Sequence, residues 1–182
     1  VLMMALGWPV EAAGDARGDA SIRQDAGTFG REIRFGVAAH DVNGNGGREG
    51  GTDLSVELRG NRTTGAFWQF LLAPRPHVGV NVHSAFETSS LYAGLTWAFP
   101  LGDTWYLSAD FGGAVHTGRL ERTKSDRLAL GSRLLFREAV EIGIHVGPRW
   151  RAGLRADHMS NAHLASPNDG LTTIGLMFSR DF

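Results

Sequence analysis

The chain has 182 residues, which is enough for one domain, and its formal net charge at pH 7 is -1. A chain this close to neutral lacks the basic stripe of a nucleic-acid-binding protein, so a nucleic-acid partner is excluded. Cysteine is absent, which excludes disulfide scaffolds, thiolate metal sites and cysteine nucleophiles together.

The first segment differs in composition from the rest of the chain. Residues 1–10 are almost all apolar, and most of residues 11–16 are small. This is typical of a secretory signal peptide that lacks its basic start, with cleavage between Ala13 and Ala16; an apolar N-terminal helix is the alternative. We therefore expect a signal-peptide remnant over residues 1–16, a flexible arm over residues 17–27 and a barrel domain over residues 28–182.

From Gly30 onward, apolar and polar residues alternate with a period of two, which is typical of strands with one apolar face. No later apolar run is long enough for a transmembrane helix. The alternation predicts eight strands, of which the second continues irregularly towards Phe70. Their apolar faces lie within residues 33–39, 54–58, 78–82, 91–99, 105–115, 140–146, 150–156 and 174–178.

The connections between these strands differ in length. The second, fourth and sixth are short (residues 73–76, 100–103 and 147–149), whereas the first, fifth and seventh are long (residues 41–51, 117–130 and 161–170). The third, near residues 87–90, is short as well. Long loops at one end and short turns at the other are typical of an up-and-down outer-membrane barrel with both termini inside. The seventh connection then lies on the outer side.

A soluble lipocalin-like barrel or a sandwich is the alternative, and alternation alone does not distinguish it from a membrane barrel. The signal remnant, the loop asymmetry and an apolar row that ends on Phe182, interrupted by Arg180, favour the membrane barrel. Aromatic residues near strand ends fit girdles at the two membrane interfaces: Trp97, Phe99, Trp105, Trp150, Phe178 and Phe182. The predicted fold class is all-β, an eight-stranded antiparallel up-and-down transmembrane β-barrel of the outer membrane.

A reactive pair stands at the end of the seventh strand. His158 and Ser160 are two residues apart and so share a face, which continues backwards as an apolar stripe to Trp150. In a membrane barrel that face points at lipid. The pattern therefore places a base and a hydroxyl nucleophile where they are aimed at lipid.

The segment His158-Met159-Ser160-Asn161-Ala162, followed by Pro167-Asn168-Asp169-Gly170, resembles the active-site segment of the lipid A 3-O-deacylase (PagL) family. Residues 74–79 and 91–97 are similar to the acyloxyacyl-hydrolase-like branch, and the likeness covers residues 67–182. The resemblance implies an outer-membrane hydrolase whose site opens on the outer wall and removes the ester-linked hydroxyacyl chain of lipid A. The implied partners are lipopolysaccharide and outer-membrane lipids, with the site towards the outer leaflet. No cofactor or metal is implied, and a homodimer is left open.

The resemblance assigns the base to His158 and the nucleophile to Ser160, with Asn161 and Asn168 as candidates for the oxyanion hole. The family's third catalytic residue is a Glu on the last strand, and Thr172 occupies its position. A hydroxyl lacks the charge that stabilises an imidazolium. Asp169 as a substitute acid, a threonine that only holds the tautomer, and weak or lost activity remain three alternatives. A catalytically silent barrel, structural or lipid-binding, is therefore the competing function.

Overall fold

The computed structural model describes residues 30–43 and 47–182. The expected signal-peptide remnant at residues 1–16 and the expected arm at residues 17–27 lie outside the described residues. None of the helices in the described ranges is both long enough and apolar enough to cross a membrane.

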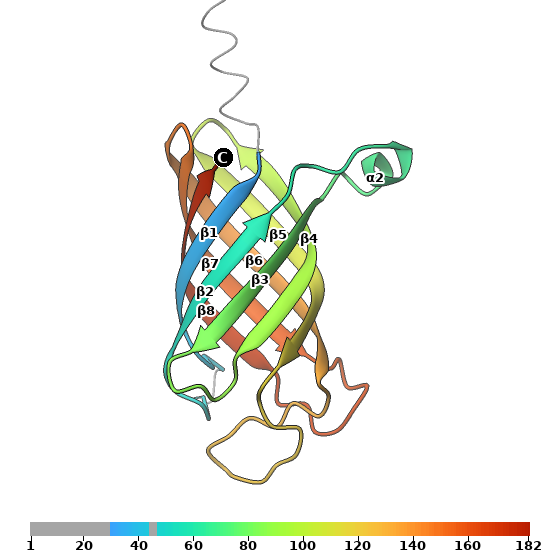
Figure 1. The fold of residues 1–182 in the computed structure, drawn as a ribbon, viewed down its shortest axis with the longest axis vertical. Coiled ribbons are helices and arrows are strands. Elements are labelled where there is room, and N and C mark those ends of the chain that lie inside the picture. Colours follow the sequence, from blue (N-terminus) through green and yellow to red (C-terminus); the bar gives the residue numbers. More distant parts are fainter. Residues whose placement is uncertain (1–29, 44–46) are drawn as a thin grey trace, which may run out of the picture.

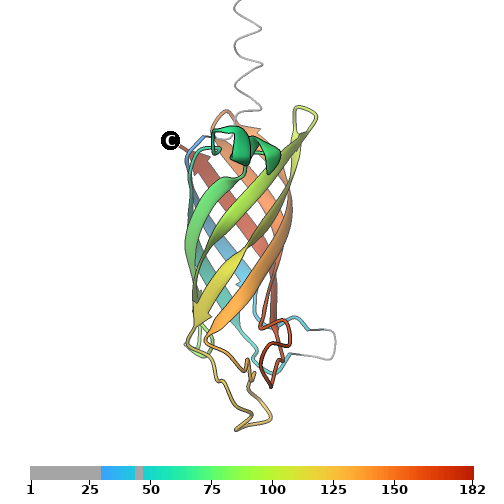
Figure 2. The ribbon, with the colours of Figure 1, turned by 90° about the vertical axis from the view of Figure 1, so that its right-hand side faces the viewer.

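Eight strands form a closed barrel in which consecutive strands pair antiparallel and the last strand closes on the first. Figures 1 and 2 show the strands inclined to the long axis around one lumen. The strands are β1 Glu32–Ala39, β2 Thr52–Arg59, β3 Arg75–His83, β4 Ser90–Leu101, β5 Trp105–His116, β6 Leu134–Gly147, β7 Trp150–Ser160 and β8 Leu171–Asp181. The predicted number and up-and-down order of strands are confirmed.

The connections separate to the two ends of the barrel as expected. The described parts of the connections that follow odd-numbered strands comprise residues 40–43, 47–51, 84–89, 117–133 and 161–170, and they gather at the bottom of Figure 1. The tight turns at residues 102–104 and 148–149 lie at the opposite end, beside the C-terminus. We call the end that carries the connections after odd-numbered strands the outer end, and the end that carries the tight turns and the C-terminus the inner end.

The second connection departs from the prediction. It spans residues 60–74 and contains the short helix α2, Ala66–Phe70, where an irregular strand and a short turn were expected. Pairing of β2 with β3 ends at Arg59, and beyond it the N–H of Gly60 donates to the carbonyl of Pro76 at 2.8 Å. Pro76, on β3, has no N–H to donate back to Gly60, so the pairing of β2 with β3 ends there and the chain leaves the sheet after Arg59. Figure 1 shows α2 standing away from the wall.

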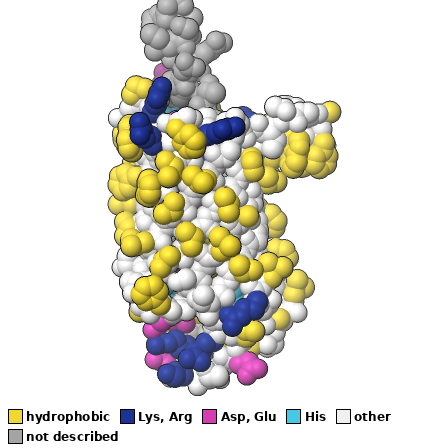
Figure 3. All heavy atoms as spheres, viewed as in Figure 1, with side chains coloured by type: hydrophobic (Ala, Val, Ile, Leu, Met, Phe, Trp, Pro, Cys, Tyr) yellow, Lys and Arg dark blue, Asp and Glu magenta, His cyan; other side chains and the backbone are white. Residues whose placement is uncertain are grey.

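The apolar faces of the strands point outward, and the charged faces point into the lumen. Phe35, Leu54 and Leu154 are among the large apolar side chains that stay exposed on the wall. Figure 3 shows hydrophobic side chains over the middle of the barrel, with charged side chains gathered near its two ends. A soluble barrel would have the opposite arrangement, so this wall faces lipid. The lipocalin-like alternative is therefore excluded.

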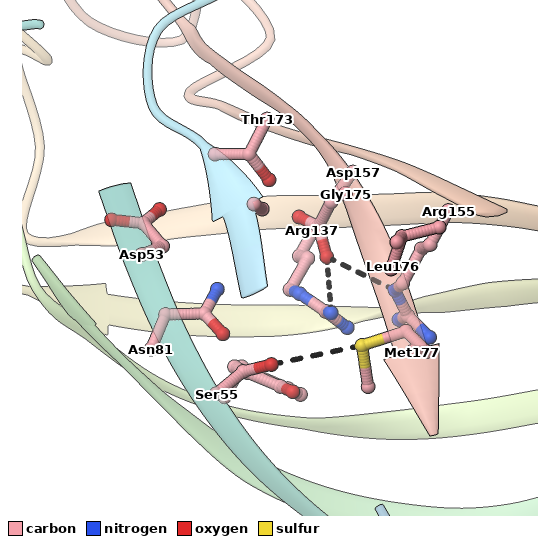
Figure 4. Close-up of a pocket in the computed structure, with 12 residues that line it drawn as sticks. Asp53, Ser55, Asn81, Arg137, Arg155, Asp157, Thr173, Gly175, Leu176 and Met177 are labelled. Atoms are coloured by element: carbon pink, nitrogen blue, oxygen red, sulfur yellow. Dashed lines mark hydrogen bonds and ion pairs between the residues drawn. The ribbon is translucent and has the colours of Figure 1, made fainter. Parts of the chain in front are cut away.

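The lumen is filled by paired charges. Arg155 contacts Asp110 and lies 3.5 Å from Glu57 and 3.4 Å from Glu141, and each of these side chains is buried. Burying a charge is tolerated where opposite charges and hydrogen bonds surround it. The pocket in Figure 4, beside Arg155 and Asp157, has a volume of only about 20 Å³, which is room for about one water molecule. The barrel is therefore a packed support for its outer wall rather than a wide pore.

The six predicted girdle aromatics all lie towards one end. They occupy the ends of β4 and β8 and the starts of β5 and β7, which meet at the inner end. The prediction that they divide between two interfaces is therefore wrong. Alternation predicts whether a side chain points to the lumen or to lipid, but it does not predict how far along the barrel axis the side chain lies. Arg180, which interrupts the terminal row, lies with its guanidinium carbon 5.5 Å from the ring centroid of Trp150, consistent with a cation at a membrane interface.

Candidate active site

Three of the sequence-predicted site residues meet on the outer wall near the outer end. His158 and Ser160 lie on the outward face of β7, and Thr172 lies on β8 directly opposite His158. The wall around them is apolar, with Phe136 opposite Ser160 on β6. All three side chains are partly exposed. The structure thus places a base and a hydroxyl on the lipid-facing side of the barrel, as the alternation predicts.

Thr172 orients the histidine ring. Nδ1 of His158 lies 2.8 Å from Oγ1 of Thr172, a hydrogen-bonding distance. Gly170 lies against the other part of the ring, because a Cβ built there would be 2.9 Å from Cε1 of His158. Gly170 also has φ of +66°, a conformation that favours glycine. The ring is therefore held from two sides, by a hydroxyl and by the loop backbone.

Ser160 follows His158 by two residues on the same outward face of β7. No hydrogen bond links His158 and Ser160 in the described structure. Residues two apart on a strand have Cα atoms roughly 6.6 Å apart, so the imidazole must lean along the strand to meet the hydroxyl. Catalytic hydrogen bonds are often long without substrate and shorten when it binds. Ala162 and His163 follow with φ of 51° and 61°, so the chain turns sharply just past Ser160.

The two asparagines have different surroundings. The side-chain NH₂ of Asn161 donates to the carbonyls of Leu130 and Pro167, each at 2.9 Å, so it ties two outer loops together. The backbone N–H of Asn161 donates to Oδ1 of Asn168 at 3.0 Å. No described residue accepts a hydrogen bond from the NH₂ of Asn168. Of the two predicted oxyanion donors, Asn168 has the free amide group and Asn161 does not.

Asp169 is engaged away from the histidine. Its carboxylate accepts hydrogen bonds from Arg48 at 2.7 Å, from Arg122, and from the N–H of Ala129 at 2.8 Å. These partners come from three segments of the outer loops. The structure therefore does not bring Asp169 to His158, although Gly170, the next residue, packs against the ring. The carboxylate serves as a junction of the outer loops.

An apolar groove runs beside Ser160. It has a volume of about 530 Å³ and is lined by residues of β5, β6 and the loop after β7. Gly113, on the outward face of β5, adds no side chain to the groove, and Phe136, which pairs with Ser160, is one of its lining residues. A groove of this size and character, open on the lipid-facing wall, suits a hydrocarbon chain.

A second cluster of ligand-type side chains lies at the outer end. Donor atoms of His40, Asp53 and His83 lie within 4.8 Å of one another. Each ring nitrogen nevertheless has a hydrogen-bond partner: His40 bonds Asp53 at 2.8 Å and Glu49 at 3.4 Å, while His83 bonds the carbonyl of Gly50 and the N–H of Glu87. The cluster therefore anchors the first outer loop through hydrogen bonds.

High pH is expected to loosen this anchor. Burial alone would lower the pKa of His40, but hydrogen bonds and the charges of Asp53 and Glu49 outweigh burial and raise the pKa to about 9. The stabilisation is fully present below the unfolded value of about 6.5 and is lost as the pH rises through 9. Trypsin cleavage at Arg48 should therefore speed up at least several-fold between pH 7.5 and 10, after correction for the enzyme's own pH dependence.

The matched variant for this experiment is His40→Gln, which should be cleaved rapidly already at pH 7.5 and show little further change. A wild-type cleavage rate that stays constant up to pH 10 would mean that the charged form of His40 does not hold the loop.

Sequence reasoning missed one polar residue of the wall. Glu138 lies on β6 directly opposite His158, with its side chain outward and exposed. The apolar face predicted for the sixth strand starts at residue 140, whereas β6 begins at Leu134. The available signal was the apolar row Leu134, Phe136, Val140 and Ile142, in which Glu138 is the single interruption.

Comparisons with known proteins agree with this arrangement. Residues 77–181 match the family model described as lipid A 3-O-deacylase (PagL). The lipid A deacylase PagL of Bordetella bronchiseptica is 27% identical over 151 residues, which cover 79% of this chain and 69% of that protein.

Solved structures share the fold. The outer membrane enzyme PagL superposes with a TM-score of 0.62 at 22% identity, covering 83% of this chain and 99% of that one. Neisserial surface protein A gives a TM-score of 0.60 at 9% identity, with 86% and 99% covered. The barrel domain of Pseudomonas aeruginosa OprF gives 0.50 at 11% identity, with 84% and 96% covered.

Proposed function

Because the chain belongs to the lipid A 3-O-deacylase (PagL) family, we propose that it is an outer-membrane serine esterase that hydrolyses the 3-O-linked hydroxyacyl chain of lipid A. The observation that carries the proposal is the outward placement of His158 and Ser160 beside an apolar groove on a lipid-facing wall. An ester of a membrane lipid reaches such a site by lateral diffusion in the outer leaflet, whereas a water-soluble ester would not require it.

In the proposed reaction Ser160 Oγ attacks the ester carbonyl, and Nε2 of His158 accepts the hydroxyl proton. The tetrahedral intermediate collapses, the sugar oxygen leaves, and His158 returns the proton to it. Water then attacks the acyl-enzyme with His158 again as base, which releases the hydroxy acid and restores Ser160. For Nε2 to be the basic nitrogen, Nδ1 must carry the proton and donate to Thr172 Oγ1, which lies 2.8 Å away. Thr172 would thus fix the tautomer.

The proposed oxyanion donor is Asn168. Its NH₂ group has no acceptor among the described residues, and its Oδ1 is held by the backbone N–H of Asn161 at 3.0 Å. A side chain fixed through its oxygen presents its nitrogen in a set direction, as a preorganised donor requires. Asn161 would act indirectly, by holding Asn168 and the loop carbonyls of Leu130 and Pro167.

Filling the groove is expected to change which acyl chains are cleaved. A Cβ at Gly113 would meet its nearest atoms at 3.7 Å, an ordinary contact, so Gly113→Leu fits the fold while its side chain enters the groove. Cleavage of long acyl chains should fall about tenfold or more, and short chains should be affected much less, since lost burial scales with chain length. The measurement is release of fatty acid from substrates that differ in chain length.

The matched control is Ala109→Leu, on the same outward face of β5 but away from the groove. It should leave the chain-length preference unchanged. Equal preference in Gly113→Leu and wild type would show that the acyl chain lies elsewhere.

The function itself is tested with purified protein refolded in detergent and incubated with lipopolysaccharide. Mass spectrometry should show lipid A that has lost one 3-O-linked hydroxyacyl group. Intact lipid A in the presence of a folded barrel would favour the second candidate function, a catalytically silent barrel. The observation behind that candidate is Thr172 at the position of the family's Glu.

A further inference from the structure

The outward faces of the strands carry two formally charged residues within the described part of the chain, Glu138 and Arg180. Arg180 lies at the inner end over the ring of Trp150. Glu138 lies towards the outer end, flanked by apolar residues of its own strand and by Phe111 on β5. A carboxylate on a lipid-facing wall carries a desolvation cost that rises with its depth in the bilayer. A carboxylate placed at this cost beside His158 therefore suggests a role at the site.

Register places Glu138, His158 and Thr172 in one row across β6, β7 and β8. Directly opposite residues of an antiparallel pair have Cβ atoms about 4.5 to 5.5 Å apart, close enough for their side chains to interact. Thr172 bonds the ring from one side, and Glu138 stands on the other. No described residue forms a hydrogen bond or an ion pair with the carboxylate of Glu138. The negative charge therefore has His158 as its polar neighbour in the row.

On the basis of the proposed function, we propose that Glu138 is a positioning residue that stabilises the protonated His158 formed during catalysis. The family's acid contributes both orientation and charge, whereas the Thr172 hydroxyl contributes orientation alone. Glu138 would supply the charge from the neighbouring strand. The two roles are thus divided between residues on opposite sides of the ring. Because the site faces lipid, the interaction is screened less than it would be in bulk water.

The test measures activation of Ser160 directly, by the rate at which a fluorophosphonate probe labels the refolded protein in detergent. Glu138→Gln keeps the shape of the side chain and removes its charge. Labelling should slow about tenfold to a hundredfold, because the imidazolium formed when Ser160 attacks the probe then lacks the neighbouring anion. Glu121→Gln, an exposed carboxylate of the outer loop, is the matched control and should behave as the wild type.

Rescue separates a charge effect from a structural one. Adding Thr172→Glu to Glu138→Gln returns a carboxylate to the other side of the ring, and labelling should recover most of the lost rate. A Glu138→Gln protein with the wild-type labelling rate would overturn the proposal, as would a slow variant that Thr172→Glu fails to rescue. A wild type that is not labelled would overturn it too. Lipid A hydrolysis is scored separately, so a labelled protein that leaves lipid A intact contradicts the proposed function and not this inference.

Discussion

Replacing Ser160 by alanine is expected to abolish deacylation while the barrel stays folded. The rate should fall by about 10⁴-fold or more, because removing a nucleophile leaves only binding and oxyanion stabilisation. The Ser160 hydroxyl makes no hydrogen bond in the described structure and lies partly exposed on the wall, so its removal should change the free energy of unfolding by less than about 0.5 kcal/mol. Mass spectrometry of lipid A from cells expressing each protein gives the readout.

Folding is checked in the same cells by heat-modifiable migration, which should match between variant and wild type. Ser125→Ala, in an outer loop, is the control and should retain activity. Full activity in Ser160→Ala would assign the nucleophile to another group and remove the basis of the proposed mechanism.

Loss of the base is the second large effect. His158→Ala should lower the rate by about 10³-fold or more, since Ser160 then lacks a group to accept its proton. The deletion also leaves a space beside Gly170 and Thr172, where the ring now packs. Free imidazole added to this variant should enter that space and restore part of the activity. The measurement is the initial rate of fatty-acid release with increasing imidazole concentration.

His163→Ala is the matched control, because His163 follows the site by a few residues in the same outer loop and is exposed. It should keep the wild-type rate. An active His158→Ala protein, or an imidazole effect equal in His158→Ala and Ser160→Ala, would contradict the role of His158 as base.

The strands were predictable because their signal is local. Side chains alternate across a strand, so a row such as Val78, Val80 and Val82 identifies both the strand and its lipid-facing side. The same rule placed His158 and Ser160 on one face. It failed at residues 60–74, where the chain leaves the sheet after Arg59 and forms α2, and at the start of β6, where Glu138 lies in an otherwise apolar row. In both places the local pattern was short or interrupted.

The residues around the histidine were only partly predictable. Thr172 was located by its position relative to the active-site segment, and the structure brings it to Nδ1 of His158. Asp169 was an equally reasonable acid by sequence distance, yet Arg48, Arg122 and the N–H of Ala129 hold its carboxylate. Those partners come from other loops. These partners bind the Asp169 carboxylate in place of His158, and whether they can do so depends on how the outer loops pack against one another.

By itself the sequence determined the alternation of faces, the side of the wall that carries the reactive pair, and the likeness to one family. These properties depend on residues close in the chain. Only the tertiary structure showed that Glu138, His158 and Thr172 lie in one row and that an apolar groove lies beside them. It also showed that Asp169 bonds to other outer loops rather than to His158. The physical reason is lateral register: hydrogen bonding between strands and closure of the barrel set which residues lie opposite each other, and no single strand encodes that pairing.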